Sequence, residues 1–171
     1  MQSNIKGAPS FSYVDVALNA GESIVAEAGA MASMDVGIES KAVLNGGLFS
    51  ALFKSLLGGE SFFVNIFTNT SEQPKQLVLV QNTPGDIKQV AFTGKTVLCL
   101  QPGTYLASTP GIKMSVKWAG FRSWFAREGL FKLRLSGKGL LWFGAYGGIL
   151  FKEINGQLLV DTSHLLLMSR R

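Results

Sequence analysis

The sequence predicts an all-β protein built from repeated units, and three observations support this prediction. Short runs rich in aromatic and β-branched residues recur along the 171-residue chain. Most of its 20 glycines fall between these runs, where turns are expected. One pattern of glycines and strand-forming residues also recurs in the same order further along the chain. Many short strands at regular spacing are typical of an all-β sandwich or a barrel-like fold.

The expected strands follow the chain in order. The first spans residues 11–18, where Val14, Val16 and Leu18 alternate with other residues and so share one face. Further strands are predicted where aromatic and β-branched residues concentrate, at residues 62–68, 77–80, 96–100, 130–135, 140–143 and 158–160. The single cysteine, Cys99, lies in one of these apolar runs, and we expect it to pack in the core.

The repeat predicts how the chain is organised. One copy begins GESIVAEAGAM at Gly21 and a second begins GKTVLCLQPGTY at Gly94. Matched glycine pairs, eight residues apart, follow in each copy: Gly29 and Gly37, then Gly103 and Gly111. A third copy opens at Gly156. We expect one domain, residues 1–171, with units at about 20–93, 94–155 and 156–171. The third unit is expected to be cut short, which would leave a strand edge without its partner.

Two segments depart from the strand pattern and are predicted to be short inserted helices. GGLFSALFKSLLGG carries apolar residues at helical spacing between glycine pairs, which predicts a helix over residues 47–57. Residues 120–127 are a shorter analogue. The apolar residues of both segments are Leu48, Phe49, Leu52, Phe53, Leu56, Phe121, Trp124 and Phe125. They would cap the β unit, contact another subunit or insert into a membrane surface, and the sequence leaves these three alternatives open.

Charge is distributed unevenly. Residues 1–110 carry six lysines and eight acidic residues, a balance of −2. Residues 111–171 carry five lysines, five arginines and three acidic residues, a balance of +7. Such asymmetry indicates either a solvated basic face or an anionic partner, nucleic acid or lipid headgroups. The candidate anion-binding residues are Arg122, Arg127, Lys132 and Arg134.

The sequence offers no catalytic constellation. If residues 158–164 formed a strand, Asp161 and Ser163 would share one face and His164 would point to the other, which excludes a triad. One histidine and one cysteine cannot build a structural zinc site. We therefore expect no enzymatic activity, no metal and no cofactor. No targeting segment and no run of eighteen apolar residues is visible, so we expect a cytoplasmic protein, free or peripheral to a membrane.

Several motifs together resemble a known family. Between about residues 10 and 168 they occur in the order GESIVAEAGAM, GGL, LLGGESFFVNIFT, PGDI, LASTPGI, REGLF, LRLSG and VDTSH. This set resembles the uncharacterised bacterial proteins related to the fungal mitochondrial biogenesis protein named for altered inheritance of mitochondria. The resemblance implies a fold similar to the tryptophan-attenuation RNA-binding protein (TRAP): a double-stranded β-helix in three internal repeats, often oligomeric. It implies no established enzymatic activity, and its fungal member is linked to inner-membrane organisation.

From these observations we predict a non-enzymatic scaffold or interaction protein. It is expected to be a homo-oligomer, with a trimer favoured, and to act at or near a membrane surface through the two inserted segments. The alternative is RNA binding through the basic C-terminal half, for which basic residues interleaved with aromatic ones in residues 113–134 are the only sequence support. Nucleic acid is the less favoured partner, because a shared fold does not carry a shared function.

Overall fold

The computed structural model describes residues 1–44, 63–101, 103–118, 131–161 and 164–169, and over these residues the predicted all-β class is confirmed. The strands are β1 (Gln2–Lys6), β2 (Tyr13–Leu18), β3 (Ser23–Glu27), β4 (Met31–Met34), β5 (Ile38–Leu44), β6 (Phe63–Asn69), β7 (Lys75–Val80), β8 (Ile87–Thr93), β9 (Leu98–Leu100), β10 (Tyr105–Ser108), β11 (Ile112–Trp118), β12 (Phe131–Gly144) and β13 (Leu167–Ser169). The inserted helices predicted at 47–57 and 120–127 lie outside the described residues. The closer likeness to TRAP stays a prediction.

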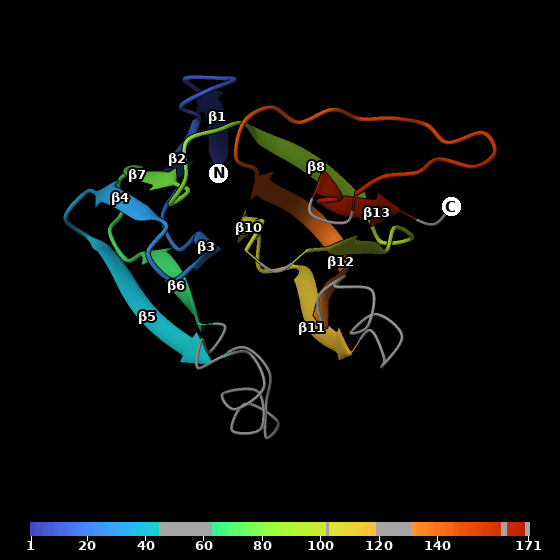
Figure 1. Cartoon of the computed structure of the whole chain (residues 1–171). Coiled ribbons are helices and arrows are strands. Elements are labelled where there is room, and N and C mark those ends of the chain that lie inside the picture. The colour runs from blue at the N-terminus through green and yellow to red at the C-terminus, as the bar shows by residue number, and fades with distance from the viewer. Residues whose placement is uncertain (45–62, 102, 119–130, 162–163, 170–171) are drawn as a thin grey trace.

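The strands form antiparallel sheets (Figure 1). One sheet has the order β1-β2-β7-β4, and the other has the order β13-β9-β12-β10-β3-β6-β5. Strands β8 and β11 join the second sheet by pairing with β12. Strand β12 is therefore the centre of the second half of the chain.

The two halves of the chain use the same strand pairings. In the first half, β6 pairs with β3 and β5, and β7 pairs with β2 and β4. In the second half, β12 makes all four corresponding pairings, with β9 and β11 and then with β8 and β10. A β-bulge occurs at matching places, between Met31 and Ser33 and between Tyr105 and Ala107. Apart from β1 and β13, each strand of one half therefore has a counterpart in the other.

The sequence prediction of two strands at 130–135 and 140–143 was wrong, because they are parts of the single strand β12. Its glycines allow two close backbone approaches. A Cβ on Gly137 would lie 2.2 Å from the Gly111 carbonyl oxygen, and a Cβ on Gly139 would lie 1.9 Å from Thr109 Oγ1. At this place the backbone amide of Lys138 donates to the Gly111 carbonyl at 3.2 Å. The glycines allow another segment of the same backbone to pass close to β12, and they do not end the strand.

The predicted strand at 158–160 is also corrected, since these residues take no strand conformation and are exposed. A strand forms only where a neighbour pairs with its backbone, and within the described part of the chain none does so here. The strand at 11–18 is confirmed as β2, which begins two residues later than predicted.

Two clusters of buried apolar side chains form the core. The first gathers Val14, Val16 and Leu18 of β2 with residues of β3, β6 and β7 and with Trp142. The second gathers residues of β9 and of the first part of β12 around Tyr105 and Phe143. Cys99 is half-buried, while its neighbours Leu98 and Leu100 are buried. The alternation along β9 turns the two leucines to the core and the cysteine to the other face.

Candidate functional site

Three turns from distant parts of the chain meet at one junction. They precede β2, precede β8 and follow β12, and a parallel bridge joins Phe11 to Gly85 and another joins Gly85 to Gly147. The amide of Ser12 donates to the Gly85 carbonyl at 3.0 Å, and the amide of Asp86 donates to the Gly147 carbonyl at 2.7 Å. The same contact is thus made twice, from the first turn to the second and from the second to the third.

Gly85 is the residue that lets the turns approach. A Cβ at this position would lie 1.8 Å from the Ala145 carbonyl oxygen and 2.7 Å from the Gly147 amide nitrogen. Both atoms belong to the backbone, so a side chain could not be accommodated by rotating a neighbour. Beside the junction the buried Asp86 carboxylate lies 2.7 Å from Lys88 Nζ, which compensates its charge.

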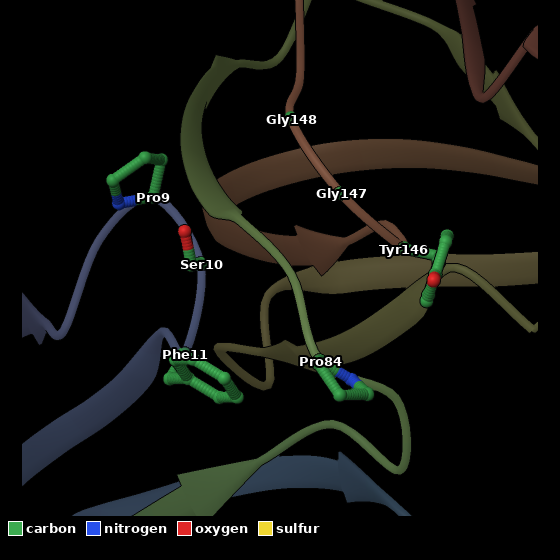
Figure 2. Close-up of a pocket in the computed structure, with 7 residues that line it drawn as sticks. All are labelled: Pro9, Ser10, Phe11, Pro84, Tyr146, Gly147 and Gly148. Atoms are coloured by element: carbon green, nitrogen blue, oxygen red, sulfur yellow. The ribbon is translucent and has the colours of Figure 1, made fainter.

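The junction leaves a pocket of about 300 Å³ (Figure 2). The pocket is lined by Pro9, Ser10, Phe11, Pro84, Tyr146, Gly147 and Gly148. Phe11 and Tyr146 are 73% and 82% exposed, so their rings are presented to solvent. None of these lining residues carries a charge, so the pocket suits an apolar side chain or ring and supplies no acid–base pair. None of the sequence patterns described above predicts this pocket.

A second surface is more strongly apolar. The segment after the junction exposes six large apolar side chains, here called the apolar row: Leu150, Phe151, Ile154, Leu158, Leu159 and Val160. The segment is fixed to the second core cluster by Ile149, which packs against it. The ring of Phe151 also meets Phe143 edge to face, with centroids 6.4 Å apart. Leu159, the last residue of the row but one, has a relative exposure of 101%.

A backbone hydrogen bond between His164 and Asp161 follows the apolar row. The His164 amide donates to the Asp161 carbonyl at 3.0 Å, which closes a turn. The imidazole Nδ1 lies 3.9 Å from Asp161 Oδ1, and both side chains are exposed. The strand geometry that we used to exclude a triad was therefore wrong here. Because Ser163 lies outside the described residues, the absence of a triad stays a prediction.

Most of the predicted site residues lie outside the described part of the chain. These are Leu48, Phe49, Leu52, Phe53, Leu56, Phe121, Arg122, Trp124, Phe125 and Arg127. Lys132 and Arg134 are described, on β12, where they alternate with the buried Leu133 and Leu135. Arg134 is exposed and Lys132 is half-buried, and both belong to the strand face that points away from the core. The described part of the chain also contains no helix long and apolar enough to cross a membrane.

Comparison with known proteins supports the resemblance seen in the sequence. A protein from Streptococcus pyogenes with a crystal structure is 26% identical to this chain, with a TM-score of 0.77. The match covers 99% of this chain and 76% of that one. No curated protein matches the chain. The model of the family described as mitochondrial biogenesis AIM24 matches residues 3–171. The chain therefore belongs to the mitochondrial biogenesis AIM24 family.

Proposed function

We propose that this protein is a non-enzymatic scaffold that assembles with further copies of itself. The observation that carries the proposal is the apolar row, in which six large apolar side chains are exposed within eleven consecutive residues, 150–160. Single exposed apolar residues are ordinary, whereas a contiguous group of them marks a contact surface. The cores of protein interfaces are apolar and depleted of charge. Residues 150–160 share this character, with Lys152 and Glu153 as their charged residues.

Composition supports the same proposal. Apolar residues make up 47% of the chain and charged residues only 16%, below the quarter that is usual for soluble domains. A surface poor in charge is stable in water when other copies cover part of it. The described pocket adds exposed rings without adding a charged group. The apolar row is therefore the surface that we assign to self-assembly, and the pocket lies outside it.

Membrane contact and RNA binding rank below self-assembly. Membrane contact was predicted from residues 47–57 and 120–127, which lie outside the described residues, so it stays a prediction. RNA binding would need aromatic platforms among the cations. The described outward positions of β11 and β12 carry three cations and one serine, and no aromatic ring: Lys113, Ser115, Lys132 and Arg134. No observation on the described residues favours the RNA alternative.

The test is the mass of the protein in solution. Sedimentation velocity and light scattering over a hundredfold range of concentration should show assemblies for the unaltered chain. Leu159→Asp places a charge in the apolar row at a fully exposed position and should return the protein to monomer without changing its circular dichroism. Phe11→Asp places the same charge in the pocket and should leave assembly intact. A monomer at every concentration for the unaltered chain would refute the proposal.

A further inference from the structure

We infer that the free edge of β4 in one copy pairs with residues 158–160 of a second copy, antiparallel, with Ser33 opposite Val160. This inference rests on the proposed self-assembly and names its contact. It follows from a pairing that the fold makes twice and that is not made a third time among the described residues of one chain. Three steps lead to it: the repeated pairing, the identity of the two unpaired members, and the register.

The repeated pairing joins each unit to the next. Strand β10 of the second unit pairs with β3 of the first, and β13 pairs in the same way with β9 of the second. The two registers correspond residue by residue: Ala107 opposite Ala26 and Ser108 opposite Val25, then Leu167 opposite Leu100 and Met168 opposite Cys99. One arrangement thus recurs at two places in the sheet.

The first unpaired member is residues 158–160. After β3 the Ala30 amide donates to the Glu27 carbonyl at 3.1 Å, and after β9 the Thr104 amide donates to the Gln101 carbonyl at 3.3 Å. The turn closed by the His164 amide and the Asp161 carbonyl, at 3.0 Å, is the third of this series. The residues that lead into it, 158–160, therefore take the place of β3 and β9 in the third unit.

The second unpaired member is β4. It is the counterpart of β10, since both pair with their own unit across the same β-bulge, β4 with β7 and β10 with β12. The other edge of β10 holds β3, whereas among the described residues nothing pairs with the other edge of β4. Met31 and Met34 at this edge are each 39% exposed. An exposed strand edge of this kind is a template for a strand from another chain.

The register follows from spacing. Ser33, the residue of β4 that corresponds to Ala107, lies seven positions after Ala26. Leu167 likewise lies seven positions after Val160. Because Ala107 lies opposite Ala26 and Leu167 lies opposite Leu100, the third pair must place Ser33 opposite Val160. A slip of one residue would turn every side chain of the segment to the other face, so the register is a strict prediction.

The partner is a second copy because the segment is held far from its own β4. Val160 lies only seven positions before Leu167, which pairs with Leu100 of β9. Figure 1 shows β4 and β13 on opposite sides of the molecule. Pairing with a second copy keeps every described strand in place. The contact joins two different surfaces, so it is head to tail and generates a ring or a row of copies.

The experiment is disulfide trapping between two single-cysteine variants. In a Cys99→Ser background, Ser33→Cys and Val160→Cys are purified separately, mixed and oxidised mildly. Opposed residues of antiparallel strands have the Cα separation that a disulfide needs. The mixture should give a disulfide-linked dimer on a non-reducing gel, well above the level of either variant alone. Leu159→Cys mixed with Ser33→Cys is the matched control, one residue out of register, and should give much less.

The outcomes separate this inference from the proposed function. If the protein sediments as an assembly but the mixture does not cross-link, the β4 contact is wrong while self-assembly stands. If a single chain carrying both cysteines loses its free thiols without a change in mass, the segment closes on its own β4, which overturns the second copy as partner. If the unaltered protein is a monomer throughout, both proposals fail. Retained circular dichroism in all variants excludes misfolding as the cause.

Discussion

Replacing Gly85 by alanine tests whether the three turns meet as closely as the structure shows. The new Cβ would lie 1.8 Å from the Ala145 carbonyl oxygen, where contacts under 3.0 Å are essentially never seen. Because the neighbour is backbone, the turn must move by about 1 Å. That movement breaks the hydrogen bonds from Ser12 to Gly85, from Asp86 to Gly147 and from Ala145 to Asp86. At about 0.5–1.5 kcal/mol each, the expected loss of unfolding free energy is about 2–4 kcal/mol.

Gly147→Ala is the matched control in the adjoining turn. Gly147 has a φ of 76°, and a Cβ there would meet no atom within 4 Å. The substitution therefore costs only the strain of a left-handed backbone, roughly 1 kcal/mol. Both variants are compared with the unaltered protein by urea titration, with circular dichroism and tryptophan fluorescence as probes.

The difference between the two variants is the measured quantity. An unchanged slope of free energy against urea would show that the folded and unfolded states expose the same surface in all three proteins. If Gly85→Ala costs 1 kcal/mol or less, as the control does, then the close approach of Gly85 to Ala145 and Gly147 is wrong. The pocket built on that approach would then be wrong as well.

Two buried polar side chains give the remaining predictions. Burial raises the pKa of Tyr105, whose hydroxyl donates to the Val25 carbonyl at 3.1 Å. Its contribution to stability is present in full below the unfolded-state pKa of 10.0 and is lost as the pH rises further. Urea titrations should show Tyr105→Phe less stable by about 1–2 kcal/mol at pH 7 and less sensitive to pH above 10; an unchanged alkaline slope would contradict this. Asn69, fully buried, donates to the carbonyls of Leu18 and Gln73 at 2.8 Å each. Asn69→Ala should cost about 2–4 kcal/mol in the same assay, and Asn69→Asp at least as much at pH 7, because a carboxylate would face both carbonyls.

Local sequence patterns were sufficient to predict the strands in which buried and less buried side chains alternate. In β2 the residues Val14, Val16 and Leu18 are fully buried, as their spacing predicts, and the residues between them are half-buried. In β10 every residue is buried, so no alternation marks it in the sequence. Strands with two covered faces are indistinguishable by periodicity from other apolar runs. Strands with a clear alternation, such as β2, were enough to predict the all-β class.

Glycine was the source of the main error and of the main missed signal. Gly137 and Gly139 resemble a turn between two strands, yet they lie within β12 because Gly111 and Thr109 approach them. Those neighbours are nearly thirty residues away, so no local pattern could reveal the contact. Position 85 likewise requires glycine because of residues some sixty positions later in the chain. The recurrence of a glycine at matched places predicts a close approach, but only the fold identifies what approaches.

The segment 158–160 shows what local propensity leaves open. Its sequence is strand-forming, and Leu158, Leu159 and Val160 have the apolar side chains of a buried strand, yet all three are exposed. A strand depends on backbone hydrogen bonds with a neighbour, and these cannot come from the segment itself. The repeat nevertheless specifies that neighbour, because β3 and β9 each have one at the same place. A repeated sequence therefore predicts the contacts that one chain leaves unmade, and such contacts are where a second copy is expected to bind.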